Sequence, residues 1–268
     1  MREILPQAAL LLFSGRFQAT LEGGKMLRAR LVQDLGIAAG QPEQVRVCAG
    51  AAVEMLHAAS LLHDDIVDGG TRRRGVPALW VTEGARAAVI LGDLLMSLAV
   101  ECVQQTLPDR IPLLVATFRE MCEAEAEQEF ALFGDDVSRE RCISIARRKT
   151  GSLFGFAAVC AGGDDARLKD SLCRVGYALG TAYQLADDML DVSAVSDAAD
   201  KTLGTDRLTG KLTAASAAEQ DDPPIAETIH SLLQVASEQL VPWPPIQKAL
   251  QAYIATHLSP LIASYLKL

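Results

Sequence analysis

The sequence predicts an all-α protein, a single-domain helical bundle around a deep central cavity. Residues 113–222 contain no proline, so long helices can run through the middle of the chain. Apolar residues recur every three or four positions in residues 44–65 and 173–190, and no alternating strand pattern with hairpin turns is found. We therefore expect one domain over residues 1–268, with two acidic helices facing each other at the mouth of the cavity.

The expected helices are separated by short segments rich in glycine, proline and aspartate, none of which is long enough to link two domains. In chain order, these loops are residues 36–44, 68–77, 107–112, 133–138, 161–166 and 197–211. The stretch 217–227, which contains a Pro-Pro pair, is the weakest point of the pattern. A separate C-terminal helical cap could begin there.

The composition is typical of a soluble globular protein. Of 268 residues, 50% are apolar and 22% charged, so a sizeable core is available. Six scattered cysteines include no CxxC pair and no Cys/His cluster, which argues against zinc and disulfides and favours a reducing cytoplasm. The apolar stretch 85–100 contains Arg86 and Asp93, so no stable membrane span is expected.

The net charge of −9 disfavours nucleic acid as a partner. It also makes an anionic substrate unfavourable unless a metal ion or local basic residues receive it. The grouping of acidic and basic residues along the chain therefore decides which chemistry the protein can perform.

Residues 61–68, LLHDDIVD, place three aspartates on one side of a helix. At about 100° per residue, Asp64, Asp65 and Asp68 fall within about 100° of arc. Like charges about 4 Å apart repel by roughly 4 kcal/mol near a protein surface, and the helix C-terminus disfavours negative charge further. A cation is the obvious partner for such a cluster.

The same acidic pattern occurs a second time. Residues 182–191, AYQLADDMLD, match residues 59–68, ASLLHDDIVD, at Ala, Leu and all three aspartates, which places Asp187, Asp188 and Asp191 on one helix face. Two such faces set opposite each other form an oxygen-lined cavity for hard cations, and Mg²⁺ binds through a few carboxylates together with substrate phosphates. One DDxxD at a helix end could be a solvated terminus, but its repetition favours a metal site.

Basic residues accompany both acidic motifs. His57 lies two helical turns, roughly 10 Å, before Asp64 and within about 20° of it around the helix, so it is expected to face the same cavity. The acidic run 123–129, EAEAEQE, is interpreted as a solvated helix face, with Gln128 close to the cavity wall. The basic candidates are Lys25, Arg28, Arg72, Arg73, Arg74, Lys149, Lys201 and Lys211.

Taken together, these motifs resemble the trans-isoprenyl diphosphate synthases, or polyprenyl synthetase family, which includes farnesyl, geranylgeranyl and longer polyprenyl diphosphate synthases. The resemblance runs from GGKMLR to TGKLT, roughly residues 20–213, and contains both aspartate motifs in order and with family-like spacing. It implies the isoprenoid synthase type of helical fold and a homodimer.

The resemblance implies a magnesium centre with three Mg²⁺ ions. By this resemblance, some aspartates bind the metal ions directly, and the others support these ligands or lie in a second coordination shell. The direct ligands are Asp64, Asp68 and Asp187, and the supporting residues are Asp65, Asp188 and Asp191.

The resemblance also implies two substrates, an allylic prenyl diphosphate beside the metals and isopentenyl diphosphate in a metal-free pocket. This division is chemically sensible, because metals assist a diphosphate that leaves, whereas Arg and Lys hold one that stays. The residues implied for the allylic diphosphate are Arg73, Lys149 and Lys201, with Thr150, Gln184 and Lys211 nearby, and those for isopentenyl diphosphate are Lys25, Arg28, His57 and Arg74.

The implied reaction is ionisation, condensation and elimination, which gives an all-trans, head-to-tail product longer by one isoprene unit. Magnesium stabilises the departing pyrophosphate, and Lys149 and Lys201 take part of the developing charge. The double bond of isopentenyl diphosphate attacks the allylic cation, and a proton is then lost to the released pyrophosphate. No side-chain nucleophile is needed.

Three other classes compete with this interpretation. A class I terpene cyclase would keep an acidic pair but would not need Lys25, Arg28 and His57. A non-catalytic partner subunit would not need two intact aspartate motifs. A His-Asp metal-dependent phosphohydrolase would need a compact set of histidines, whereas His57 and His63 lie about 120° apart around the helix.

Product length is the least constrained expectation. In the resembled family, the residues four and five positions before the first motif help to set the floor under the growing tail, and here Ser60 and Ala59 are both small. This favours geranylgeranyl or a longer product over farnesyl, although Met55, one turn deeper, could still act as a floor. Ala29, Ala214 and the short C-terminal part depart from the family pattern and leave open how the isopentenyl pocket is closed.

Overall fold

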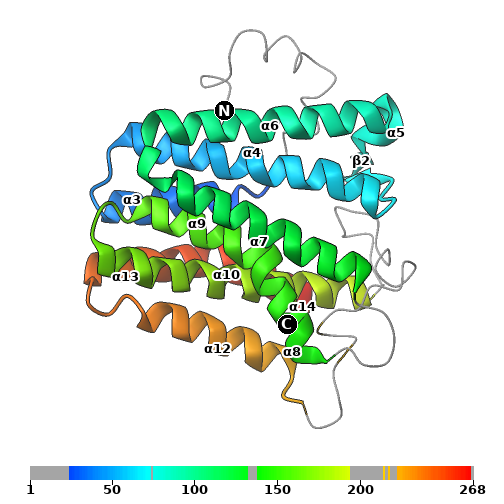
Figure 1. Ribbon diagram of the computed structural model, residues 1–268. Helices are drawn as coiled ribbons and strands as arrows, with labels where there is room; N and C mark the ends of the chain where they lie inside the picture. The colour runs from blue at the N-terminus through cyan, green and yellow to red at the C-terminus, as the bar shows by residue number, and fades with distance from the viewer. Residues whose placement is uncertain are drawn as a thin grey trace.

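The part of the chain that the structure describes is almost entirely helical, which confirms the predicted all-α fold (Figure 1). The computed structural model describes residues 24–73, 75–131, 138–193, 214, 217 and 222–266. Within these ranges, the strands β1 (Arg72–Arg73) and β2 (Val76–Pro77) form a short antiparallel hairpin. The helices are α3 (Leu27–Ala38), α4 (Glu43–Val67), α5 (Leu79–Glu83), α6 (Ala85–Thr106), α7 (Ile111–Phe130), α8 (Arg139–Ala146), α9 (Ser152–Ala161), α10 (Ala166–Ser193), α12 (Ile225–Glu238), α13 (Pro244–Tyr253) and α14 (Ser259–Leu266).

Three short helical segments of other types complete the path. A 3₁₀ turn, Pro108–Arg110, leads into α7, and a π-helical segment, Ile254–Leu258, joins α13 to α14. A second π-helical segment, Arg147–Gly151, joins α8 to α9 without a break. Single π-helical turns inside α-helices are rare and occur often at functional sites, so this second segment is a marker for the site below.

The helices α4 and α10 contain the two periodic segments from which helices were predicted. The helix α4 begins directly after Pro42 and has Asp68 as its C-cap, so the first acidic motif occupies its last turns. The helix α10 carries the second motif in its own last turns. Both helices end at the same end of the bundle, beside the β1–β2 hairpin in the case of α4 (Figure 1).

The loops agree with the expected positions where the chain is described, although some are shorter. The connection expected over residues 36–44 is reduced to residues 39–42, since α3 extends to Ala38. The hairpin occupies the expected loop 68–77, and residues 162–165 separate α9 from α10. The expected loop 197–211 and residues 132–137 lie outside the described residues.

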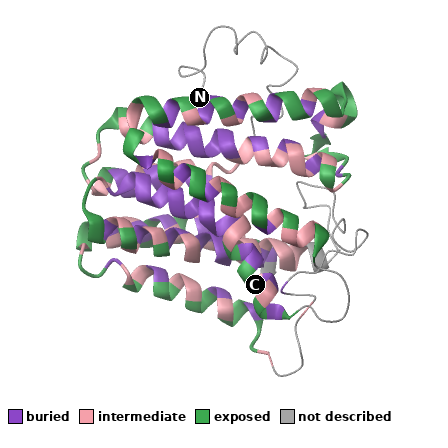
Figure 2. Ribbon diagram, viewed as in Figure 1, coloured by how far each residue is buried: buried purple, intermediate pink, exposed green. Residues whose placement is uncertain are grey.

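The centre of the bundle is α9, all of whose residues are buried. Its sequence, SLFGFAAVCA, is small or apolar on every side, which is typical of a helix enclosed by others. One side of α9 shares a core cluster with α4, α6 and α7, and the other side shares a second cluster with α3, α10 and α12–α14. Figure 2 shows buried residues concentrated in α4 and α9, while α6 and α12 are exposed on their outer sides.

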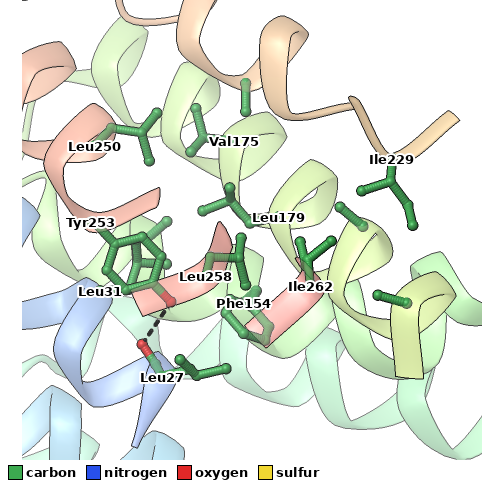
Figure 3. Packing of buried hydrophobic residues seen from close by; sticks show 14 of the residues in the cluster. Leu27, Leu31, Phe154, Val175, Leu179, Ile229, Leu250, Tyr253, Leu258 and Ile262 are labelled. Atoms are coloured by element: carbon green, nitrogen blue, oxygen red, sulfur yellow. Dashed lines mark hydrogen bonds between the residues drawn. The ribbon is translucent and has the colours of Figure 1, made fainter. Parts of the chain in front are cut away.

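The C-terminal helices pack into the second cluster and do not form a separate cap. Ile229 of α12, Leu250 of α13 and Ile262 of α14 lie in the same core as Leu179 of α10 (Figure 3). The buried hydroxyl of Tyr253 donates a hydrogen bond to the carbonyl oxygen of Leu27 at 3.0 Å. This bond ties α13 to the first residue of α3.

Glycines bring α9 and α10 close to backbone contact. A Cβ atom at Gly176 would lie 2.3 Å from the carbonyl oxygen of Phe154. A Cβ atom at Gly180 would lie 2.7 Å from the Cα atom of Gly151. Both separations are too short for carbon, so a larger residue would force the helices apart. The second acidic motif, which follows on α10, is therefore held close to α9.

Two helices, α4 and α6, are long and apolar enough to cross a membrane by length and composition alone. In the bundle, 61% of the most apolar window of α4 and 44% of that of α6 are buried. Their apolar residues largely form the first core cluster, which is how core helices of globular proteins pass the same criterion.

Gly176→Ala is expected to lower the free energy of unfolding by about 1–3 kcal/mol, because its methyl group would overlap the backbone of α9. Thermal or urea unfolding followed by circular dichroism measures the change. Gly50→Ala is the matched control, since a Cβ atom there lies 3.5 Å from its nearest neighbour, the Cβ atom of Ala29. The control should be neutral or stabilised by up to about 1 kcal/mol through helix propensity, and equal losses in both variants would contradict the tight contact.

Candidate active site

A cavity of about 370 Å³ lies beside the C-terminal halves of α4 and α10. Its wall is formed by α3 and the residues before it, α4, α6, α7, the π-helical segment, α9, α10 and the end of α14. Asp64 of the first acidic motif and Asp187 of the second both line it. The structure therefore brings the two motifs into one cavity, although 123 positions separate them in the sequence.

Asp64 is the aspartate of the first motif that faces the cavity most directly. Burial raises the pKa of its carboxyl group to about 6, although the nearby Lys149 ammonium lowers it. The neighbouring carboxylates of Glu125 and Asp68 raise it further. A second, divalent positive charge would relieve the same repulsion and lower this pKa, as bound cations do.

The other two aspartates of the first motif have different surroundings. One oxygen each of Asp68, Glu125 and Glu129 lie within 4.8 Å of one another, a grouping that could hold a metal ion. Asp65 is buried and does not line the cavity, and its Oδ1 atom accepts a hydrogen bond from Nε of Arg73 at 3.0 Å. Asp65 therefore holds Arg73 of the hairpin against the end of α4 and does not itself face the cavity.

The second motif shows a similar division. Asp187 lines the cavity, whereas Asp188 accepts a hydrogen bond from Nε2 of Gln184 at 2.8 Å and is not among the lining residues. Asp191 lies in the last turn of α10, and its side chain is outside the described part of the structure.

The π-helical segment presents Lys149 and Thr150 to the cavity. Nζ of Lys149 donates a hydrogen bond to Oε1 of Gln128 at 3.1 Å and forms an ion pair with Glu125. The hydroxyl of Thr150 donates to Oε1 of Gln184 at 2.6 Å. Through these contacts, the π-helical segment that precedes α9 links α7 to α10 beside the carboxylate of Glu125.

A basic group lines another part of the same cavity. Arg28, at the start of α3, is buried with its guanidinium 4.6 Å from the ring centroid of Phe154. Burial lowers the pKa of Arg28, and the carboxylate of Glu54 opposes this shift. Lys25 and His57 line the same region. Lys25 precedes Met26, whose φ of 52° is unusual for a residue other than glycine and turns the chain sharply before α3.

Of the other expected substrate-binding residues, Arg73 lines the cavity from β1, next to the buried Asp65. Arg74, Lys201 and Lys211 lie outside the described residues, so their roles stay predictions.

The apolar part of the cavity differs from the expected tunnel floor. Ser60 lines the cavity, but Ala59 and Met55 are fully buried in the first core cluster and are not part of the lining. Met96 of α6 and Phe118 of α7 contribute apolar side chains to the lining instead.

Sequence reasoning missed several lining residues. Glu125 belongs to the run interpreted as a solvated face, yet its side chain is only 22% exposed and pairs with Lys149. A signal existed, because Glu125 and Glu129 are four residues apart and share a helix face. Tyr183 and Tyr265 were also missed, and the second of these could not be found from local sequence because its partner, Lys25, lies 240 positions away.

The imidazole of His63 packs against α6 at Gly92, where the absence of a side chain leaves space for the ring. A Cβ atom at Gly92 would lie 2.2 Å from Nε2 of His63, and the same nitrogen is 3.3 Å from the carbonyl oxygen of Val89. His63 therefore fixes the last turns of α4 against α6, next to Asp64. This position suits a packing role and not a role as a shared metal ligand with His57.

A bundle that places two aspartate motifs and a group of cations around one partly apolar cavity defines the isoprenoid synthase class of helical proteins. The model of the polyprenyl synthetase family matches residues 12–240 of this chain. The chain therefore belongs to the polyprenyl synthetase family, as its motifs predicted.

Relatives of this chain are prenyl diphosphate synthases. It is 32% identical over 265 residues to a probable farnesyl diphosphate synthase of Bradyrhizobium diazoefficiens, which covers 89% of this chain and 78% of the relative. It is 31% identical over 209 residues to a nonaprenyl diphosphate synthase of Mycobacterium tuberculosis, which covers 76% of this chain and only 60% of the relative. The two names denote products of different length.

Solved structures show the same fold. A geranyltranstransferase of Thermotoga maritima superposes with a TM-score of 0.76 at 24% identity, covering 98% of this chain and 94% of that one. A polyprenyl synthase of Caulobacter crescentus, complexed with calcium and isoprenyl diphosphate, has a TM-score of 0.70 at 25% identity, covering 95% and 87%. Members of the family use a divalent metal, and the acidic group found here has the oxygen ligands that such ions prefer.

Asp64→Asn is expected to stabilise the metal-free protein more at pH 7 than at pH 4. Because the folded pKa of about 6 lies above the ordinary 3.8, ionising Asp64 costs the folded state free energy as pH rises between these values, and nothing below them. The difference should be on the order of 2 kcal/mol. Urea unfolding at both pH values measures it.

The control for that experiment is Asp93→Asn, which removes one carboxylate whose side chain is 65% exposed. The expectation would be contradicted if Asp64→Asn raised the free energy of unfolding equally at both pH values. It would also be contradicted if Asp93→Asn gave the same pH-dependent rise.

Proposed function

We propose that this protein is a trans-prenyltransferase that condenses an allylic prenyl diphosphate with isopentenyl diphosphate. The observation that carries the proposal is that one cavity combines both aspartate motifs, a separate basic group and an apolar wall. The aspartate motifs suit a diphosphate that leaves, and the basic group suits a diphosphate that stays. The apolar wall suits a prenyl tail. Family membership and the names of the relatives support the same reaction class.

The acidic end would hold Mg²⁺, for which we propose three ions. Asp64 and Asp187 face the cavity, and Asp68 is grouped with Glu125 and Glu129 beside them. When bound, magnesium neutralises charge on a diphosphate and so makes it a better leaving group. The remaining members of the two motifs, in supporting roles, are Asp65, Asp188 and Asp191.

The allylic diphosphate would lie between this acidic end and the cations nearest to it. Lys149 and Arg73 line the cavity on this side, and each is held by a carboxylate, Glu125 or Asp65. Such pairing keeps the two cations extended toward the place where charge develops, which is the requirement for electrostatic catalysis. Thr150 and Gln184 complete this side, and Lys201 and Lys211 are proposed for it from the sequence alone.

Isopentenyl diphosphate would occupy the basic group formed by Lys25, Arg28 and His57, with Arg74 added from the sequence. The ionised allylic group leaves its electron pair on the departing diphosphate. The double bond of isopentenyl diphosphate then forms a carbon–carbon bond to the allylic carbon, and the resulting cation loses a proton to the released diphosphate. The buried apolar wall excludes water, which would otherwise capture the cation.

The product is proposed to be geranylgeranyl diphosphate or longer, with farnesyl diphosphate as the alternative. Ser60 leaves space beside α4, while Phe118 and Met96 are the larger side chains that a growing tail would meet. We propose that these two, rather than Ala59 or Met55, form the floor.

Replacing Ser60 with Phe is expected to shorten the main product, and Phe118→Ala to lengthen it by one or more isoprene units, because the first fills and the second empties the apolar wall. Mass analysis of products from geranyl and farnesyl diphosphate starters measures both. Ala59→Phe should lower stability with the product pattern unchanged, because Ala59 is fully buried outside the lining. A product shortened by Ala59→Phe alone would return the floor to the position expected from the sequence.

We also propose a cytoplasmic homodimer. Aliphatic side chains on the outer helices support association with a second copy, because Ile90 of α6 is 67% exposed and Val115 of α7 is 60% exposed. The bundle buries its other long apolar helix, α4, in the core.

Incubation with Mg²⁺, an allylic diphosphate and isopentenyl diphosphate tests the proposed function, and elongated product is expected. Asp64→Ala or Asp187→Ala should lower turnover by at least a hundredfold while the helical circular dichroism signal is kept, because each removes a carboxylate from the cavity wall. Variants with near wild-type turnover would show that the metal assignment is wrong.

The same incubation separates the competing classes. A terpene cyclase would release hydrocarbon without isopentenyl diphosphate, and a phosphohydrolase would release phosphate from one substrate alone. A regulatory subunit would do neither on its own.

A further inference from the structure

The end of the chain forms part of the cavity wall through Tyr265 of α14. This side chain is 8% exposed and lines the cavity. Its hydroxyl oxygen accepts a hydrogen bond from Nζ of Lys25, and the same nitrogen lies 4.9 Å from the centroid of the tyrosine ring. The last helix therefore reaches the first described residues, and it does so at the basic group.

A second tyrosine continues this contact toward the acidic end. The hydroxyl oxygens of Tyr183 and Tyr265 are 3.5 Å apart, and their ring centroids are 6.1 Å apart. Tyr183 lies on α10 one turn before Asp187 and lines the same cavity as Asp187 and Arg28. Burial raises the pKa of Tyr183, and Asp187 and Tyr265 add to the shift, so the phenol keeps its proton as a hydrogen-bond donor.

We propose that Tyr265 binds the diphosphate of isopentenyl diphosphate together with Lys25, and that Tyr183 holds Tyr265 in place. This inference rests on the proposed function, because it names a further residue of the same pocket. In the structure, Lys25 directs one of its three N–H donors to Tyr265. An arriving diphosphate would attract the ammonium, and the hydroxyl of Tyr265, which can rotate, would then donate its own proton to a phosphate oxygen.

A phenol has a chemical advantage at this position. A metal ion stabilises a diphosphate that departs, and would therefore also favour loss of the diphosphate that must stay attached. A neutral hydroxyl contributes a hydrogen bond to a charged acceptor without adding charge. The phenol of Tyr265 beside Lys25, held in place by Tyr183, thus adds affinity in the half of the cavity where bond cleavage is unwanted.

Tyr265→Phe is expected to raise the KM for isopentenyl diphosphate about tenfold, since hydrogen bonds to charged groups are worth that much or more. The KM for the allylic diphosphate should stay within about twofold. Tyr183→Phe should raise the first KM by a smaller factor, about threefold. Steady-state kinetics with the other substrate saturating measure each value in the full chain.

Tyr177→Phe is the matched control, because Tyr177 lies on the same helix as Tyr183, bonds to Glu120 and is not part of the cavity wall. Its loss should leave both KM values unchanged. Circular dichroism and thermal unfolding confirm that each variant is folded, and Tyr183→Phe carries the test if Tyr265→Phe does not fold.

Two outcomes would overturn the inference. An unchanged or lower KM for isopentenyl diphosphate in Tyr265→Phe would show that Tyr265 only occupies Lys25 in the free protein. An equal rise in both KM values would show a general loss of packing. A wild-type chain that forms no elongated product would refute the proposed function and this inference together, whereas an active wild type with either outcome above refutes the inference alone.

Discussion

The close approach of α9 and α10 is the constraint on which the site depends. Only glycine allows the separations seen at Gly176 and Gly180, and residues that line the cavity follow these glycines in α10. Gln184, one turn after Gly180 on α10, accepts a hydrogen bond from Thr150 in the π-helical segment that precedes α9. A larger spacing would break this bond and move the second aspartate motif away from the first. Backbone packing thus sets the dimensions of a site whose chemistry is carried by side chains.

Electrostatic balance is the second constraint, because the acidic end holds more carboxylates than one lysine can neutralise. Burial is the main cause of the raised pKa of Asp64, and the carboxylates of Glu125 and Asp68 raise it further. Lys149 offsets part of it through its ion pair with Glu125. Arg73, which also lines the cavity, is paired with Asp65. Additional positive charge would therefore be stabilising at the acidic end of the cavity, beside Asp64 and Glu125, and not at the basic end.

Local periodicity accounts for what could be predicted from the sequence. Three- and four-residue spacing predicted α4 and α10, and repetition of the aspartate motif predicted that both helices face one cavity, since both signals lie within single helices. What was missed depends on contacts between distant segments. The turning of Asp65 toward Arg73 requires the hairpin, and the burial of Glu125 requires α7 to pack beside the π-helical segment. The placement of Ala59 in the core likewise depends on the direction of α6, which no spacing in α4 reveals.

The two ends of the cavity carry opposite charge, and something must keep them from neutralising each other. A direct ion pair between the basic group and the second aspartate motif would occupy the groups that a substrate and a metal require. Arg28 is instead stacked on Phe154 and balanced by Glu54, while Tyr183 lines the same cavity as Arg28 and Asp187. An uncharged phenol in this cavity adds no charge to either end, and its hydroxyl is able to donate to a carboxylate or accept from a guanidinium. Neutral aromatic side chains thus lie in the cavity together with the charged groups, and under the proposed function each end stays available for a different diphosphate.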